Sequence, residues 1–317
     1  MNDPNTNNKN SIGRAAGIDD GTAFAALRYR EYRFLFASDL AYYLGMIGQL
    51  ALRSILAWEL THSAVALSVI SLAMGLPMLL LAPLGGVAAD RYERRRLIMV
   101  GQLVILVSGL LILALLMADR LSFWQLVVTT VATGSAFPLI SPARQALVAN
   151  IVPRSVLGNA LSLSAGGLNL ARVAGPAAIG LLYPWLGAAT TWGLSVLVYA
   201  CGILLLFGVS PQGLDASVST ASSGVRAGLR YLAENRSLRM VFLLGFVPAF
   251  IGMPFQSLLI IFADEVWRTG TLGFGLLQAA AGLGAVTGSV FVARQSGGRS
   301  AGRTMFISLT AFGVLLA

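Results

Sequence analysis

The chain has 317 residues, of which 56% are hydrophobic and only 11% are charged, and its mean hydropathy is +0.78. Soluble domains carry roughly 25% charged residues, so this composition excludes an ordinary soluble protein and predicts an all-α membrane protein. The net charge of +9 does not indicate a nucleic-acid partner, because the arginines stand in short loops between long apolar runs.

The predicted elements begin after a polar segment at residues 1–33, which lacks the apolar core of a signal peptide and is expected to be a cytoplasmic tail. A membrane-spanning helix needs about 20 apolar residues. Eight runs meet this requirement, at residues 34–60, 64–89, 97–118, 122–142, 158–184, 188–208, 238–263 and 272–293. A ninth run begins near residue 304 and is still apolar at Ala317.

The Lys and Arg residues predict the orientation of these helices. Eighteen of them fall in the tail and in alternate loops, whereas the loops on the other side hold only Arg120 and Arg268. Because basic loops stay in the cytoplasm, we expect the N-terminus on the cytoplasmic side of a bacterial inner membrane.

The polar stretch at 209–237 divides the runs into two groups. It predicts a cytoplasmic linker between a six-helix bundle at 34–208 and a second bundle at 238–317. A weak internal repeat with a shift of 207 residues relates the two groups, and parallel six-helix repeats are typical of one transporter class. In that repeat the chain stops in the middle of a helix, so we expect about eight complete helices, part of a ninth, and an incomplete second bundle.

The loop after the second run carries a group of glycine, acidic and basic residues. Gly86 and its neighbours would allow close helix approach, and Asp90 is unfavourable for the dipole of its own helix, so it needs an external basic partner. Arg144 is the best candidate for that partner within the first bundle. The expected cytoplasmic gate comprises Gly86, Asp90, Arg91, Arg94, Arg95 and Arg144. The simpler interpretation is cytoplasmic positive charge with one incidental Asp.

The fifth run carries a helix-packing pattern formed by Gly167, Gly175, Pro176 and Gly180. The glycines recur on one face, and Pro176 is expected to bend the helix. Close packing between helices explains the pattern as well as a transport role does.

Ionisable residues inside the runs are candidates for a central cavity, because a charge at mid-membrane costs roughly 2.5–3.5 kcal/mol. Arg172 lies near mid-depth and Asn169 precedes it on the same helix. Asp39 could pair with Arg172 or carry a proton, and Arg53 could extend to the membrane surface. A structural ion pair is the alternative role for Arg172.

The loop motif resembles the signature of the major facilitator superfamily through Gly86, Ala89, Asp90, Arg91, Arg94 and Arg95. Glu93 within it resembles the branch that includes enterobactin and macrolide exporters. The resemblance continues through 141–147 and 172–176, and the 166–180 stretch is similar to the Gly-Pro motif of antiporters. It implies a twelve-helix fold, alternating access and usually proton-driven export. One departure is Thr130, which stands where related drug antiporters carry an arginine four residues before Gly134.

The sequence therefore predicts a monomeric secondary-active exporter of a small organic molecule, with the lipid bilayer, that substrate and protons as its partners. The single cysteine, Cys201, and the single histidine, His62, leave no disulfide, no Cys/His metal site and no nucleophile–histidine pair. We therefore expect neither enzyme activity nor a cofactor. An importer, a lipid flippase, or a chain that does not transport on its own are the alternatives.

Overall fold

The computed structural model describes residues 24–210 and 253–295, together with 234–235, 240 and 310. Every regular element in these residues is a helix, and six helices are long and apolar enough to cross a membrane. In chain order the elements are η1 (Ala25–Arg28), α2 (Arg30–Thr61), α3 (Ala64–Arg91), α4 (Arg94–Met117), α5 (Phe123–Ile151), α6 (Arg154–Leu206), α9 (Met253–Ile261), η4 (Phe262–Val266) and α10 (Gly270–Gln295). The predicted all-α membrane architecture is confirmed.

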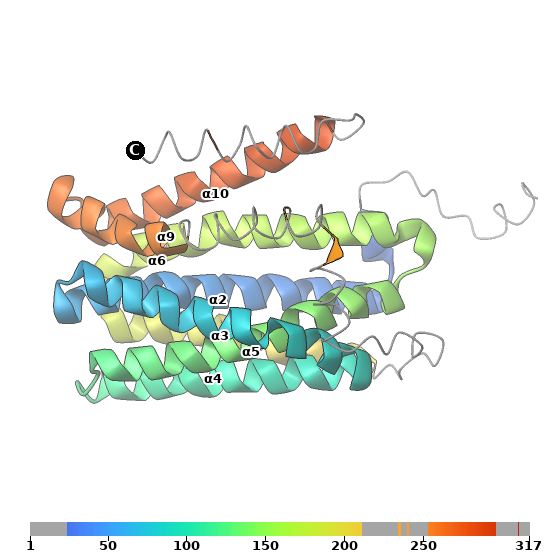
Figure 1. Cartoon of the computed structure of the whole chain (residues 1–317), viewed down its shortest axis with the longest axis horizontal. Coiled ribbons are helices and arrows are strands. Elements are labelled where there is room, and N and C mark those ends of the chain that lie inside the picture. The colour runs from blue at the N-terminus through green and yellow to red at the C-terminus, as the bar shows by residue number, and fades with distance from the viewer. Residues whose placement is uncertain (1–23, 211–233, 236–239, 241–252, 296–309, 311–317) are drawn as a thin grey trace, which may run out of the picture.

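The long helices lie side by side and alternate in direction, so the short turns gather at two ends (Figure 1). At one end, here called the basic end, α2 and α6 begin and the turns between α3 and α4 and between α5 and α6 lie. At the other, the distal end, three turns contain residues with left-handed backbone angles, namely His62, Asp119 and Arg268. The arginine-rich loops that the structure describes, between α3 and α4 and between α5 and α6, therefore share one end of the bundle.

The helix α6 contains the fifth and sixth predicted spans. Gly187, with φ 73° and ψ 176°, interrupts it at the distal end, and the chain then returns toward the basic end. A positive φ is costly for residues with a Cβ, so glycine permits this tight reversal. Two spans therefore follow one another with almost no loop.

Helix α2 is the centre of the first bundle and the most buried of the candidate spans. It packs along α6, where Ser38 donates a hydrogen bond to the carbonyl oxygen of Gly202 at 2.7 Å. A Cβ at Gly45 would lie 2.7 Å from the Cβ of Tyr199. Helix α3 packs as closely on α5, because a Cβ at Gly134 would overlap the carbonyl oxygen of Met74.

The structure corrects one sequence prediction and narrows another. The fourth span does not end at 142 but continues to Ile151 with Pro138 and Pro142 inside it, since neighbouring groups in a bundle can satisfy the backbone that a proline frees. Close approach near the loop motif is made by Gly85, where a Cβ would overlap the carbonyl of Pro138, whereas Gly86 has nothing within 4 Å. Consecutive helical residues point about 100° apart, so only one of the pair can face α5.

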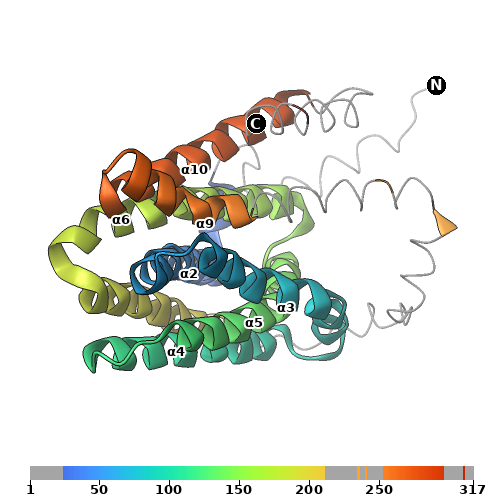
Figure 2. The same cartoon turned by 60° about the vertical axis from the view of Figure 1, so that its left-hand side comes forward.

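The elements after residue 252 lie against the first bundle, with α9 beside α3 and α10 beside α6 (Figure 2). Helix α2 begins at Arg30, slightly earlier than the predicted start at 34. Residues 1–23 of the tail, most of the linker and the ninth run lie outside the described residues, so the predictions about them stay predictions.

Candidate functional site

A buried ion pair joins the first and fourth spans. Asp39 of α2 pairs with Arg144 of α5, and the two side chains are only 6% and 3% exposed. The guanidinium carbon of Arg144 also lies 4.5 Å from the centroid of the Tyr42 ring. A carboxylate and an aromatic face together stabilise a cation that is removed from water.

This ion pair lies well inside the length of both helices, away from their ends at the membrane surface. Asp39 is nine residues after the first residue of α2, about 14 Å along the helix. Arg144 is seven residues before the end of α5, about 10 Å. The pair therefore sits in the half of the bundle nearer the basic end.

The predicted partner of Asp39 and the predicted partner of Arg144 both need correction. The sequence suggested that Asp39 could pair with Arg172, but its partner is Arg144. It also offered Arg144 as the partner of Asp90; because α5 continues past Pro142, Arg144 is buried inside the bundle and engages Asp39. Asp90 lies in the last turn of α3, and its side chain is outside the described residues.

Two arginines at the start of α4, next to the turn after α3, contact the ends of neighbouring helices. Arg94 donates from Nη1 to the carbonyl oxygen of Ala146 in α5 at 3.3 Å. Arg95 lies over the ring of Phe207 at the end of α6, 5.5 Å from its centroid. Arg91 is exposed. Arg94 and Arg95 therefore hold the loop against the first bundle at its basic end.

Arg53 is a second buried arginine, nearer the distal end of α2. It is 1% exposed, donates from Nη2 to Thr133 Oγ1 at 3.2 Å, and lies 5.3 Å from the centroid of the Trp192 ring. The expectation that Arg53 extends to the membrane surface is therefore wrong. Trp192 in turn donates to the carbonyl of Gly109 at 2.8 Å, so an uncharged cluster surrounds this cation.

Arg172 lies on α6 near the middle of the fifth span and is exposed, and Asn169 on the preceding turn is half-buried. The side chain is close enough to Tyr43 of α2 for an electrostatic interaction. Its backbone carbonyl lies where α10 approaches, because a Cβ at Gly282 would be 3.0 Å from this oxygen. Arg172 thus occupies the junction of the first bundle with α10.

The glycines predicted in the fifth span make two kinds of contact. Gly167 and Gly175 face α2, where an added Cβ would lie 3.3 Å from the Phe36 ring and 3.4 Å from Ile47, respectively. Gly180 faces α10, and an added Cβ would lie 2.8 Å from the Cα of Gly275. The carbonyl of Pro176 borders the same contact with Gly275.

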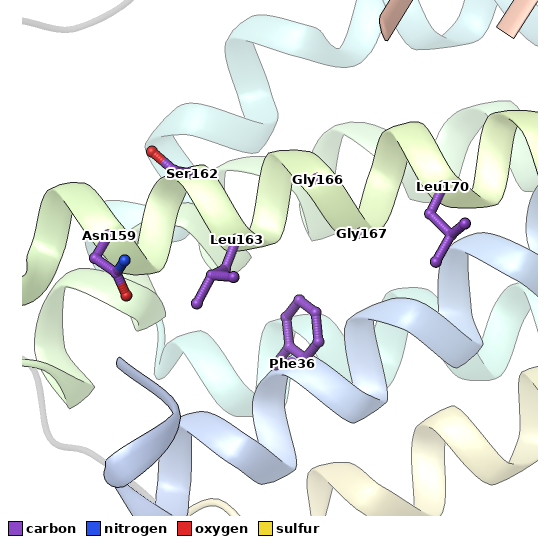
Figure 3. Close-up of a pocket in the computed structure, with 7 residues that line it drawn as sticks. All are labelled: Phe36, Asn159, Ser162, Leu163, Gly166, Gly167 and Leu170. Atoms are coloured by element: carbon purple, nitrogen blue, oxygen red, sulfur yellow. The ribbon is translucent and has the colours of Figure 1, made fainter. Parts of the chain in front are cut away.

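A shallow cleft of about 270 Å³ separates α2 from the first half of α6 (Figure 3). Its lining is mostly apolar and consists of Phe36, Asn159, Ser162, Leu163, Gly166, Gly167 and Leu170. Asn159 also accepts a hydrogen bond at 3.0 Å from the backbone N–H of Ala26 in η1. The cleft thus lies on the basic-end side of Arg172.

Polar contacts close the distal end between the first bundle and the later helices. Trp58 donates from Nε1 to Asp264 Oδ2 at 2.8 Å, joining α2 to η4, and Ser71 of α3 is hydrogen-bonded to Ser257 of α9. Sequence reasoning missed these contacts. Asp264, an acidic residue next to an apolar run, was the signal that could have indicated them.

The fold agrees with comparisons with known proteins. The family model of the transmembrane secretion effectors, a branch of the major facilitator superfamily, matches residues 21–315. The chain belongs to this family. Family members are membrane transporters, and the relatives include a staphyloferrin A transporter and a multidrug efflux pump, so the predicted family is confirmed.

The chain is similar to the staphyloferrin A transporter of Staphylococcus aureus, with 24% identity over 80% of this chain and 64% of the relative. It is 26% identical to the multidrug efflux pump Tap of Mycolicibacterium fortuitum over the same shares. A solved bacterial homologue of the human lysosomal transporter Spinster shares the fold with a TM-score of 0.56 and 17% identity, over 84% of this chain and 63% of that one. The chain spans less than two thirds of the length of these relatives.

Proposed function

We propose that this chain belongs to a proton-driven exporter of a small organic molecule that works by alternating access. The observation that carries the proposal is the ion pair of Asp39 with Arg144, buried between two spans of the first bundle. Such an intramembrane pair is expensive to bury and is typical of proton and substrate pathways.

Protonation of Asp39 would give this pair two states. When the carboxylate is charged, Arg144 has a counter-ion; when a proton neutralises it, the guanidinium stays buried beside Tyr42 alone. Removing one partner of a buried pair costs about 3–5 kcal/mol, which is comparable to the bias of about 5.5 kcal/mol that moves a two-state equilibrium from one side to the other. One proton can therefore drive a conformational change.

The conformational change would break the contacts that join the helices at the distal end. Trp58 with Asp264, and Ser71 with Ser257, join the first bundle to α9 and η4 there. With the basic end in the cytoplasm, as the distribution of Lys and Arg predicts, these contacts close the outer side. The intact ion pair coexists with this outward-closed arrangement, so protonation of Asp39 would favour opening to the outside.

Transport into everted membrane vesicles tests the proposal. Vesicles from cells that express the full-length gene product would be given an acidic interior and offered either of two xanthene dyes, the anion fluorescein or the cation pyronin Y. We expect at least one dye to accumulate, and collapse of the pH gradient to abolish its accumulation. Asp39→Asn, which cannot change its charge, should lose gradient-driven accumulation.

Vesicles lacking the protein are the control for passive partition, and Glu31→Gln at the start of α2 is the control for loss of a carboxylate. Accumulation of neither dye above the control vesicles would contradict the proposed function. Accumulation only in right-side-out vesicles would favour an importer. Equal accumulation by Asp39→Asn would remove proton coupling through this residue.

A further inference from the structure

We infer that the transported molecule is an organic anion and that Arg172 binds its carboxylate at the junction of α6 and α10. This inference rests on the proposed function and names the substrate class for it. The sequence made Arg172 a candidate for the central cavity and offered Asp39 as its ion-pair partner. The structure assigns Asp39 to Arg144.

The charges within the described spans are unbalanced in favour of cations. Asp39 is the one buried carboxylate among the described residues, and it neutralises Arg144. Arg53 is fully buried and lies over the Trp192 ring. Among the ion pairs of the described residues none involves Arg172. No carboxylate of the described residues therefore balances the charge of Arg172.

The depth of Arg172 in its span does not fit a residue at the membrane surface. Arg172 is 18 residues from the start of α6 and 15 from Gly187, about 27 Å and 22 Å along the helix. Neither end of the span is near enough for the guanidinium to reach water by extending along the helix. A mid-membrane arginine is costly unless it faces a partner or a water-filled cavity, and Arg172 is exposed in the described structure.

The surroundings of Arg172 suit a carboxylate. Its planar guanidinium can donate two parallel hydrogen bonds to a carboxylate. Tyr43 of α2 is near enough for an electrostatic interaction with Arg172. The apolar cleft lies on nearly the opposite face of α6, because Arg172 follows Leu170 of its lining by two residues, about 200° around the helix. A carboxylate bound by Arg172 would therefore lie at the junction of α6 and α10 and outside this cleft.

The junction also connects binding to movement. The carbonyl of Arg172 lies against Gly282 of α10, where an added Cβ would be 3.0 Å away. Helix α10 comes from the part of the chain after the linker, so the relative motion of the bundles would change this contact. An anion at Arg172 would consequently be held differently in the two states, which is the requirement for a substrate to shift them.

The two dyes of the vesicle assay test the inference, because fluorescein and pyronin Y share a ring system and differ in charge. We expect fluorescein to accumulate and pyronin Y to remain at the level of the control vesicles. Arg172→Gln should lower fluorescein transport at limiting dye concentration about 10-fold or more, since a hydrogen bond to a charged group is lost. Arg172→Lys should recover only part of the loss, because lysine lacks the planar fork.

The matched control is Arg154→Gln, which removes an exposed arginine at the start of the same helix and should leave fluorescein transport unchanged. Accumulation of pyronin Y without fluorescein would overturn the inference and leave the proposed function standing. Unchanged fluorescein transport by Arg172→Gln, at normal protein abundance in the membrane, would overturn the role of this residue. Accumulation of neither dye would contradict the inference and the proposed function together.

Discussion

Two arginines are buried in the same bundle, and they are stabilised in different ways. Arg144 pairs with the carboxylate of Asp39 and also lies over the Tyr42 ring. Arg53 has the Trp192 ring and the hydroxyl of Thr133. The first environment depends on a group that can take up a proton, and the second does not.

Because of this difference, Arg144 can take part in a switch, whereas Arg53 has a structural role. A change in protonation can remove the counter-ion of Arg144, whereas an indole ring and a threonine hydroxyl keep their charge state at any physiological pH. We therefore expect function to depend on Arg144 and Asp39, and Arg53 to contribute mainly to packing.

The largest effect should follow from Arg144→Gln, which leaves Asp39 buried without its counter-ion. We expect a loss of about 3–5 kcal/mol in the free energy of unfolding in detergent, the cost of breaking a buried pair. The double variant Asp39→Asn/Arg144→Gln should regain most of this stability, because no unpaired charge remains. A double variant as unstable as the single one would show that the two residues are not coupled.

The next prediction compares two glycine contacts, one inside the first bundle and one between the bundles. Gly134→Ala would push a methyl group onto the backbone of Met74, which belongs to the same bundle. We expect it to lower the free energy of unfolding by about 1–3 kcal/mol, since neither helix can retreat.

Gly180→Ala is the matched change between α6 and α10, where the added methyl group would meet Gly275. Here the helices can separate as bundles move, so stability should fall less than in Gly134→Ala. Thiol labelling of a cysteine at Ser71, in a Cys201→Ser background, should increase because the distal end opens. A Gly180→Ala protein with unaltered labelling and stability would mean that this contact is not tight.

A smaller effect should follow from Trp58→Phe, which removes the hydrogen bond to Asp264 but keeps an aromatic ring. The bond joins α2 to η4, and a typical hydrogen bond contributes about 0.5–1.5 kcal/mol. We expect several-fold faster labelling of the same Ser71→Cys position and little change in thermal stability. Tyr183→Phe, which removes a 2.6 Å hydrogen bond to Glu59 within the first bundle, is the control and should not change labelling.

The smallest effect should follow from Arg53→Met, which replaces the buried cation by an apolar side chain of similar length. The lost contact with the Trp192 ring and Thr133 is offset by removal of a buried charge, so stability should change by no more than about 1 kcal/mol. Gradient-driven dye transport should persist. Loss of transport in a stably inserted Arg53→Met protein would contradict a purely structural role for Arg53.

The sequence predicted which residues are charged inside the membrane better than it predicted their partners. Asp39, Arg53 and Arg172 were all identified, because an ionisable residue in an apolar run is conspicuous. The contact of Asp39 with Arg144 joins residues 105 positions apart, and no local pattern encodes such a distance. Arg144 was further obscured because Pro142 was taken as the end of a helix that in fact continues to Ile151.

Helix positions were predictable for a different reason. A span is set by the thickness of the bilayer, so runs of apolar residues locate α3, α4 and α10 closely. Which face of each span packs inward is not set by hydropathy, since both lipid and the bundle core are apolar. The rotation of each helix about its axis decides that Gly85 and not Gly86 makes the close contact. The same rotation places Arg53 in a buried site. Composition does not determine this rotation.

The most direct test of the account measures how protonation of Asp39 changes the distal end. Spin labels at Leu72→Cys on α3 and Leu276→Cys on α10, both exposed positions, would report the distance between the bundles in a Cys201→Ser full-length protein in lipid nanodiscs. A longer-distance population should grow as pH falls, and Asp39→Asn should show that population at every pH. The same pH titration in wild type and in Asp39→Asn would contradict a role of Asp39 as the switch.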